Sequence, residues 1–181
     1  MMKALINIDY TVDFVVGALP CGEPAQKIEN EVVRLTREFA ENGDYVVFAI
    51  DLHKEGDVFH PETKLYPPHN IKNTKGRELY GKLKDLYEEI KERDNVYYMD
   101  KTRYSAFAGT DLEIKLRERG ITELTIISLC SDICVLHTAI DAYQRGFKIV
   151  IHEKAVASFN QEGHKWALEH FKNVLGAEVI Y

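Results

Sequence analysis

Residues 124–151, LTIISLCSDICVLHTAIDAYQRGFKIVI, decide the fold class of this chain. The run 124–129 is short and apolar, as expected of a strand that is buried on both faces. Apolar residues then recur at helical spacing from about residue 133 to 145, and a second short apolar run follows at 148–151. A helix between two such strands is typical of α/β proteins, in which helices join the strands of one sheet.

The same alternation extends over the rest of the sequence. Further strands, also buried on both faces, are predicted at 4–8, 45–50, 96–99 and 178–181. Helices are predicted at about 28–39, 83–90, 110–119, 133–145 and 161–175, with Thr110 as a cap and Gly43 and Gly120 as stops. The sequence therefore predicts an α/β fold with a doubly wound, mostly parallel six-stranded sheet and helices on both faces. Because no repeat and no Pro/Gly/Ser-rich linker divides residues 1–181, one domain is expected.

Charge and composition exclude several classes of protein. The chain has 181 residues, with 23 Lys and Arg against 29 Asp and Glu, and a formal net charge of −6. Such an acidic chain lacks the basic surface on which nucleic-acid binding depends. No apolar run approaches the ~18 residues of a membrane-spanning helix, and the first residues lack the layout of a signal peptide. Three cysteines, an odd number, fit a reducing compartment, so we expect a cytoplasmic protein with neither nucleic acid nor membrane as a partner.

Polar side chains with reactive chemistry follow four of the predicted strands. Asp9 follows the first strand, Asp51 and His53 the second, Lys101 the third, and the segment CSDIC, residues 130–134, the fourth. In open α/β sheets, ligands bind outside the carboxyl ends of the strands. These side chains are therefore expected at one rim of the sheet. Each of them alone is more often an ordinary loop residue, and it is the combination of types that indicates a site.

Cys134 has the position of a nucleophile, at the predicted turn from strand to helix. Unpaired backbone N–H groups and the helix dipole favour a thiolate there. Lys101 would stabilise this thiolate and Asp9 would transfer its proton, which is the arrangement that covalent catalysis requires. The alternative is a small buried cysteine, which we expect for Cys21 and Cys130, beside a surface ion pair of Lys101 and Asp9.

The long irregular stretch after the second strand holds residues suited to a metal ion. Asp51 and His53 are two residues apart, so in an extended segment their side chains project to the same side. His69 together with Glu62 or His60 would complete a site of nitrogen and oxygen ligands, which suits zinc, iron or manganese. A solvated loop histidine is the commoner alternative for any one of them. The remaining histidines are expected to be structural or surface residues: His137, His152, His164 and His170.

Four segments of the chain resemble the isochorismatase-like cysteine hydrolases, and within them the nicotinamidases, which include pyrazinamide-hydrolysing enzymes. The segments are LINIDYTVDF (5–14), DLHKEGDVFHPETKLYPPHNIKNTKG (51–76), DKTRYSAF (100–107) and SDICVLHTAIDAYQRGFKIVIHEKAVAS (131–158). The resemblance covers nearly the whole chain. The chain differs from one familiar nicotinamidase pattern at Val58 and Tyr66, which replace a histidine and a tryptophan, and it has Ser128 where the family has glycine.

The resemblance implies a catalytic triad of Asp9, Lys101 and Cys134. It also implies an oxyanion hole, formed by the backbone N–H groups of Cys130 and Cys134. A cis peptide is typical of the family at this turn, and in this sequence it would fall near Leu129 and Cys130. Together these features imply covalent catalysis by a cysteine.

The resemblance further implies that one divalent metal ion, with zinc expected and iron or manganese as alternatives, is bound by Asp51, His53 and His69. Other nicotinamidases have a glutamate as fourth ligand at the position of Glu62. Glu62 is therefore expected as the fourth ligand in place of His60. The ion would hold the ring nitrogen of the substrate and would act as a template.

The implied reaction is the hydrolysis of nicotinamide to nicotinate and ammonia, a step of NAD salvage, with pyrazinamide as a further substrate. Phe14, Tyr66 and Tyr104 are expected to enclose the flat ring, although an isolated aromatic side chain is more often a core residue. The alternatives are another small-amide hydrolase of the superfamily, of the carbamoyl-sarcosine or ureidoacrylate type, an isochorismatase, and a non-catalytic binding module on this fold. Association into a homo-oligomer is common in the family.

Overall fold

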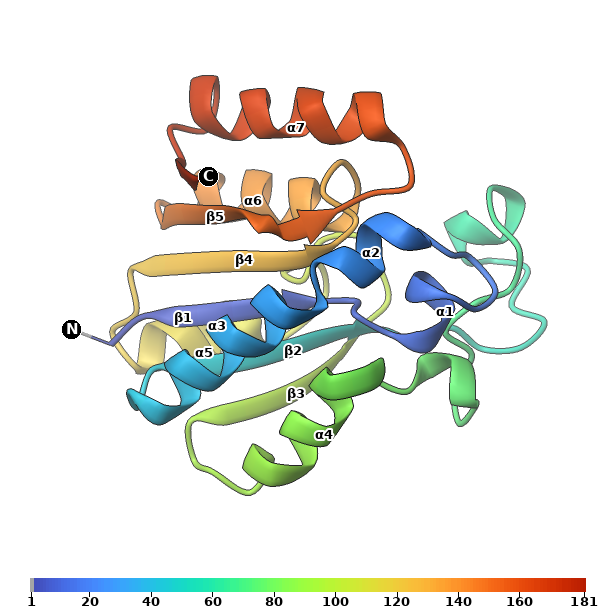
Figure 1. The fold of residues 1–181 in the computed structure, drawn as a ribbon, viewed down its shortest axis with the longest axis horizontal. Coiled ribbons are helices and arrows are strands. Elements are labelled where there is room, and N and C mark those ends of the chain that lie inside the picture. The colour runs from blue at the N-terminus through green and yellow to red at the C-terminus, as the bar shows by residue number, and fades with distance from the viewer. Residues whose placement is uncertain (1) are drawn as a thin grey trace.

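A computed structural model describes residues 2–181 and shows one sheet of six strands (Figure 1). The strands are β1 (Ala4–Ile8), β2 (Tyr45–Asp51), β3 (Val96–Lys101), β4 (Glu123–Leu129), β5 (Lys148–Ala157) and β6 (Glu178–Ile180). They pair in the order β3-β2-β1-β4-β5-β6, and every pairing between them is parallel. Because the strand order reverses beside β1, the connections run in both directions, which confirms the predicted doubly wound sheet.

Helices cover both faces of the sheet. Apolar side chains of α1 (Val12–Val15), α2 (Glu23–Lys27), α3 (Glu29–Glu41) and α4 (Gly81–Ile90) belong to the core on one face. Those of α5 (Leu112–Glu118), α6 (Cys134–Gln144) and α7 (Gln161–Asn173) belong to the core on the other face. Two short 3-10 helices, η1 (Pro61–Lys64) and η2 (Lys75–Arg77), lie in the long connection after β2. Figure 1 shows this connection, together with α1, at one end of the sheet.

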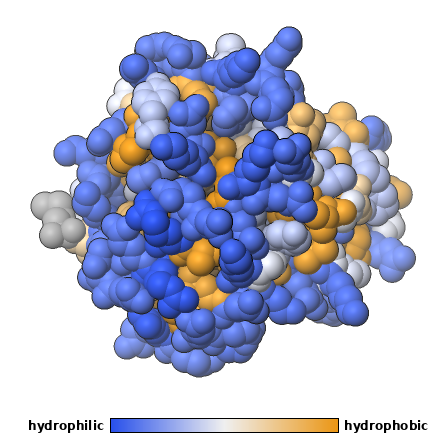
Figure 2. Space-filling view, viewed as in Figure 1, coloured by the Kyte–Doolittle hydropathy of each residue, from blue (hydrophilic) through white to orange (hydrophobic). Residues whose placement is uncertain are grey.

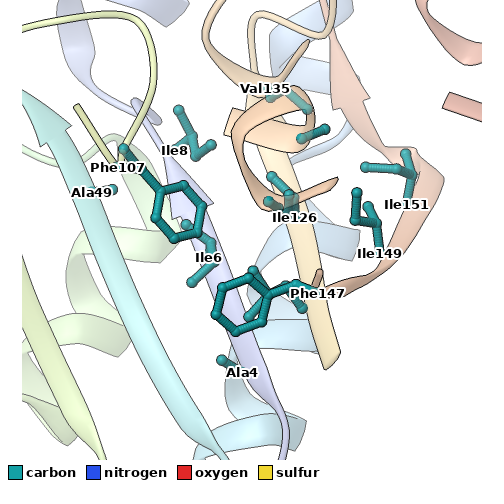
Figure 3. Close-up of a cluster of buried hydrophobic side chains, with 14 of the residues drawn as sticks. Ala4, Ile6, Ile8, Ala49, Phe107, Ile126, Val135, Phe147, Ile149 and Ile151 are labelled. Carbon is teal, nitrogen blue, oxygen red and sulfur yellow. The ribbon is translucent and has the colours of Figure 1, made fainter. Parts of the chain in front are cut away.

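The central strands are buried because both of their faces are covered. Every residue of β1 and β2 is buried. Figure 3 shows part of one core, in which Ile6 of β1 and Ile126 of β4 lie among apolar side chains such as Phe107 and Phe147. The next residue of β4, Ile127, belongs to the core on the opposite face, as the alternation of side chains along a strand requires.

Two strands differ from the expectation that all of them are buried on both faces. β3 and β6 form the edges of the sheet, and several of their residues are partly or fully exposed. An edge strand has a neighbouring strand on one side only, so its residues are less completely covered than those of the central strands. β5 is also longer than expected and continues to Ala157.

The helices show further differences from the sequence-based prediction. α1 and α2 were not predicted, because helices of four and five residues are too short to display a helical period. The N-cap of α5 is Asp111 and not Thr110, although the hydroxyl of Thr110 accepts a hydrogen bond from the backbone N–H of Leu112. Gly120 has a φ of +64° just after α5, which confirms its predicted role as a stop.

The molecular surface is mainly hydrophilic on the face shown in Figure 2, and apolar side chains gather toward the end at which Figure 1 places α1. Large apolar side chains are exposed directly after α1 and in the connection after β2: Val16, Val58, Phe59 and Leu65. None of the helices within residues 2–181 combines the length and the apolar character needed to cross a membrane.

The reversal of strand order determines where a ligand can bind. β1 and β4 are neighbours at the point of reversal, and crevices form at such points outside the carboxyl ends of the strands. Asp9 directly follows β1, Lys101 is the last residue of β3, and Cys134 is the first residue of α6, after β4. The topology therefore brings these three residues to the rim at which the sequence places them.

Candidate active site

The side chain of Lys101 lies at the centre of the candidate active site. Its Nζ is 2.7 Å from Oδ2 of Asp9, 3.2 Å from Oδ1 of Asp51 and 3.6 Å from Sγ of Cys134. The side chain of Lys101 is 0% exposed, and an unpaired ammonium group would be costly there. Burial alone would lower the pKa of Lys101, but the charges of Asp51 and Asp9 hold it well above its ordinary value, so the group is a cation.

Asp9 is held by the ends of β2 and β3, which both lie on one side of β1. Its backbone has a φ of +56°, which is uncommon for a residue other than glycine and is found mainly where a site requires it. Oδ1 of Asp9 accepts a hydrogen bond of 2.8 Å from the backbone N–H of Asp51, and Oδ2 faces Lys101. Burial raises the pKa of Asp9 to about 6 against the opposing effect of Lys101. This carboxyl group can therefore both accept and return a proton near neutral pH.

The side chain of Cys134 is buried, which favours the thiol over the thiolate in the absence of substrate. Burial raises the pKa of Cys134 well above its ordinary value, and this effect exceeds the lowering by Lys101. The negative charges of Asp9 and Asp51 also raise this pKa. The sequence showed the helix start and the nearby cation, but the extent of burial depends on residues from distant segments.

The turn between β4 and α6 presents two backbone N–H groups toward the same region. The peptide bond between Leu129 and Cys130 is cis, as expected from the resemblance. Within residues 2–181, neither the backbone N–H of Cys130 nor that of Cys134 donates a hydrogen bond. Ser128 has a φ of +90° and donates a 2.6 Å hydrogen bond to Asn7, so serine is accommodated where the family has glycine. The two free N–H groups are suited to bind an oxyanion.

Cys21 and Cys130 are buried, as predicted, and their sulfur atoms are 3.2 Å apart. Cys21 comes from the segment between α1 and α2, so this contact joins that segment to the β4–α6 turn. Both side chains belong to the core on one face of the sheet, and Cys130 also borders the pocket described below.

Four side chains form a compact cluster of metal-ligating types beside Lys101. One ligand atom from each of them lies within 4.8 Å of the others, and all four residues are buried: Asp51, His53, Glu62 and His69. Oδ2 of Asp51 is 2.8 Å from Nε2 of His53 and 3.7 Å from Nε2 of His69, which is 3.5 Å from Oε2 of Glu62. Two nitrogen and two oxygen donors at this spacing suit a divalent cation such as zinc.

The state of His69 shows that the cluster fits a cation. Nδ1 of His69 donates a 2.8 Å hydrogen bond to the carbonyl oxygen of Pro67, which leaves Nε2 as the atom that faces the cluster. Nε2 is buried and has no hydrogen-bond partner within residues 2–181. Although burial opposes it, the carboxylates of Asp51 and Glu62 raise the pKa of His69 to about 10. A position that attracts a proton so strongly also suits a metal cation.

His60 lies next to the cluster but outside it. Its Nε2 donates a 2.7 Å hydrogen bond to the carbonyl oxygen of Thr102, and its Nδ1 accepts one from the backbone N–H of Glu62. Both ring nitrogens are therefore engaged. His60 caps η1, the short helix that presents Glu62 to the cluster. This geometry supports Glu62 in preference to His60 as the fourth ligand.

A small apolar pocket lies over Cys134. Glu62 and Tyr66 line both this pocket and a neighbouring cavity, which reaches His53 and His69. The residues that line the pocket are Phe14, Leu19, Glu62, Tyr66, Tyr104, Cys130, Ile133, Cys134 and Phe159.

The expected aromatic walls are present, and three further residues join them. Phe14 contacts the ring of His69, with 5.1 Å between ring centroids, and Tyr66 and Tyr104 both line the pocket. The sequence-based prediction did not include the other apolar lining residues: Leu19, Ile133 and Phe159. Leu19 and Phe159 lie in loops without periodicity, and Ile133 lies at the start of a predicted helix, so no local pattern distinguishes the three from ordinary core residues.

Comparison with known proteins shows the family. The family model described as the isochorismatase domain matches residues 3–180. The chain belongs to the isochorismatase family. Among isochorismatase-family structures it is similar to the nicotinamidase/pyrazinamidase PncA from Bacillus subtilis, with 67% identity, full coverage of both chains and a TM-score of 0.98. It is also similar to the pyrazinamidase/nicotinamidase from Streptococcus mutans, with 54% identity, coverage of 98% and 99%, and a TM-score of 0.96.

A more distant isochorismatase-family structure holds a metal. The pyrazinamidase of Pyrococcus horikoshii, in complex with zinc, is 30% identical to this chain. The alignment covers 99% of each chain, with a TM-score of 0.86. The fold is therefore shared over the whole of both chains.

Proposed function

We propose that this protein is a nicotinamidase, which hydrolyses nicotinamide to nicotinate and ammonia and also acts on pyrazinamide. The observation that carries this proposal is the position of Cys134 at a small apolar pocket, with Lys101 and Asp9 buried beside it and Glu62 of the metal-ligating cluster in the pocket wall. The similarity to two nicotinamidase/pyrazinamidases, at 67% and 54% identity, supports the same substrate class.

The first step forms a thioester. Sγ of Cys134 attacks the carboxamide carbon while Asp9 takes the thiol proton, and the carbonyl π electrons move to the oxygen. The resulting oxyanion accepts hydrogen bonds from the backbone N–H groups of Cys130 and Cys134. Lys101 stays charged and offsets the negative charge that develops on the sulfur. When the oxyanion re-forms the carbonyl, the C–N bond breaks and ammonia leaves with the proton from Asp9.

The second step hydrolyses the thioester. Asp9, again a carboxylate, takes a proton from a water molecule, whose oxygen attacks the thioester carbon. The same backbone N–H groups hold the second oxyanion. The C–S bond then breaks, Cys134 regains its proton from Asp9, and the product leaves as a carboxylic acid, which loses its proton to solvent. Both steps use one base, which is consistent with a pKa of about 6 for Asp9.

We further propose that a divalent cation, with zinc as the expected ion, is bound by the cluster of Asp51, His53, Glu62 and His69. When bound, it supplies a Lewis acid to which the pyridine nitrogen of the substrate can attach. The side chain of Asp51 belongs to both groups, since one oxygen faces His53 and the other faces Lys101. Phe14, Tyr66 and Tyr104 would hold the ring between the cluster and the thiol.

The test compares ammonia release by the wild-type protein and by the variants Cys134→Ala and Cys134→Ser. The substrates are nicotinamide, pyrazinamide and N-carbamoylsarcosine. We expect wild-type turnover of the two aromatic amides and a loss of about 10³-fold or more in both variants, because no thioester can form. Unchanged circular dichroism controls for folding. Turnover of nicotinamide by Cys134→Ala, or wild-type activity limited to N-carbamoylsarcosine, would contradict the proposal.

A further inference from the structure

Asn70 connects the backbones of two residues in the metal-ligating cluster. It directly follows His69, and its carbonyl oxygen accepts a 3.1 Å hydrogen bond from the backbone N–H of His53. The carbonyl of His53 in turn accepts a 2.9 Å hydrogen bond from the N–H of Lys72, so the segments around His53 and Ile71 pair like two short parallel strands. A shift of Asn70 would therefore move the backbone of both His53 and His69, and with it their imidazole rings.

Two side chains from the segment after β1 bind Asn70. Oδ2 of Asp13 accepts a 2.8 Å hydrogen bond from the backbone N–H of Asn70. The hydroxyl of Thr11 donates a 2.9 Å hydrogen bond to Oδ1 of Asn70. The second oxygen of Asp13 accepts the N–H of Ala18, which fixes the carboxylate on its own segment. The proposed reaction uses neither Asp13 nor Thr11, although both side chains are buried.

The contact between these segments is tight and conformationally costly. A Cβ atom at Gly76 would lie 2.2 Å from Oδ2 of Asp13, so the backbone of η2 packs directly against the carboxylate. Asn70 has a φ of +45°, and its Nδ2 is buried without a hydrogen-bond partner within residues 2–181. Backbone strain and unsatisfied polar groups persist where the surrounding structure enforces a geometry that a site requires.

We propose that Thr11, Asp13 and Asn70 form a brace that positions the imidazoles of His53 and His69 for a divalent cation. Thr11 and Asp13 lie two and four residues after Asp9 in the same short segment. The brace therefore also holds the metal-ligating cluster in register with the carboxylate that handles the proton. These three are positioning residues, because none of them offers a ligand atom to the cluster. The inference rests on the proposed function only in taking the cluster to be a metal site.

The test measures the zinc affinity of the metal-free protein by competition with a chromogenic chelator. We expect Asp13→Ala and Asn70→Gly to lower zinc affinity about 10- to 100-fold, the range typical when partners of metal ligands are removed. Asn70→Gly keeps the left-handed backbone accessible, so the loss reports the side chain of Asn70 and not strain. Asp13→Asn, which keeps one oxygen for the N–H of Asn70, is expected to recover most of the affinity.

Asn73→Gly is the matched control. Asn73 has a φ of +64° in the same connection, but it is exposed. Its substitution is expected to leave zinc affinity unchanged. Wild-type zinc affinity in both Asp13→Ala and Asn70→Gly would overturn the brace, and so would an equal loss in Asn73→Gly or the absence of zinc binding by the wild-type protein.

Kinetics separates this inference from the proposed function. We expect excess zinc to restore the rate of nicotinamide hydrolysis in Asp13→Ala, which a general loss of folding would not allow. A wild-type protein that binds zinc but does not hydrolyse nicotinamide would contradict the proposed function alone. Wild-type hydrolysis together with unchanged zinc affinity in the variants would overturn the brace alone.

Discussion

Asp51 is the residue through which the two halves of the site interact. Oδ1 of Asp51 is 3.2 Å from the ammonium of Lys101, and Oδ2 is 2.8 Å from the imidazole of His53. Burial would raise the pKa of Asp51, but Lys101 and the two histidines His53 and His69 hold it below its ordinary value. A single buried carboxylate therefore supports the charge of the ammonium and contributes an oxygen to the cluster. Its removal would leave Lys101 with Asp9 as its only carboxylate partner within residues 2–181.

The identity of the fourth ligand can be tested with two variants. We expect Glu62→Gln to lower zinc affinity about 10-fold or more, because a neutral amide oxygen is a weaker ligand than a carboxylate. His60→Asn keeps an acceptor for the backbone N–H of Glu62 and is expected to retain zinc affinity. Competition with a chromogenic chelator measures both. Loss of zinc in His60→Asn with retention in Glu62→Gln would assign the fourth ligand to His60.

At the scale of elements, the β4–α6 turn depends on α7 for its position. The hydroxyl of Ser131 is 2.8 Å from Nδ1 of His164 in the first turn of α7, and the N–H of Ser131 donates a 2.9 Å hydrogen bond to Ala157 of β5. This confirms a structural role for His164. Because Ser131 lies between Cys130 and Cys134, these bonds hold the segment that carries the proposed oxyanion donors.

The burial of His164 gives stability a predictable pH dependence. Burial lowers the pKa of His164 below its ordinary value of about 6.5, so the unfolded chain binds more protons as the pH falls below that value. The contribution of His164 to the free energy of unfolding should therefore decrease from pH 7 to pH 5, whereas the raised pKa values of Asp9 and His69 act in the opposite direction. We expect His164→Gln to gain stability relative to the wild-type protein as the pH falls over this range, as measured by urea titration of both proteins at each pH.

A second histidine provides a comparison for His164. Burial also lowers the pKa of His152, so the double variant His152→Gln and His164→Gln should gain further stability relative to the wild-type protein toward pH 5. A pH profile of stability identical to that of the wild-type protein, in both the single and the double variant, would show that the two imidazoles do not contribute.

At the scale of the whole molecule, one sheet joins two hydrophobic cores. Ile126 and Ile127 are adjacent on β4 and both are fully buried, yet they belong to the cores on opposite faces. Both cores pack against the same strands, so loss of the sheet would expose the apolar side chains of both cores. The two faces are therefore expected to unfold together.

Substitution of these two isoleucines tests that expectation. Ile126→Ala and Ile127→Ala should each reduce the free energy of unfolding by about 2–5 kcal/mol, because each deletes buried apolar volume. Both variants should unfold in a single transition with the denaturant dependence of the wild-type protein. Two separate transitions in either variant, detected by fluorescence and circular dichroism, would show that the cores are independent.

Much of the fold and of the candidate site was accessible from local pattern. Short apolar runs and helical periods predicted all six strands and the five longer helices, because burial on two faces or on one stripe leaves a periodic trace in the sequence. The placement of Asp9, Lys101 and Cys134 at one rim followed from a general property of parallel sheets, whose carboxyl ends lie on the same side. The short helices α1 and α2 left no such trace.

The sequence by itself determined the sheet, the helices that cover it and the residue types at its rim, since these depend on neighbours along the chain. Only the tertiary structure places Glu62, and not His60, in the cluster with Asp51, His53 and His69. The same holds for the contact of Asp13 with Asn70, 57 residues apart, and for the burial that raises the pKa of Cys134. Burial, hydrogen bonding and pKa depend on which distant segments meet, and this is settled only when the chain has folded.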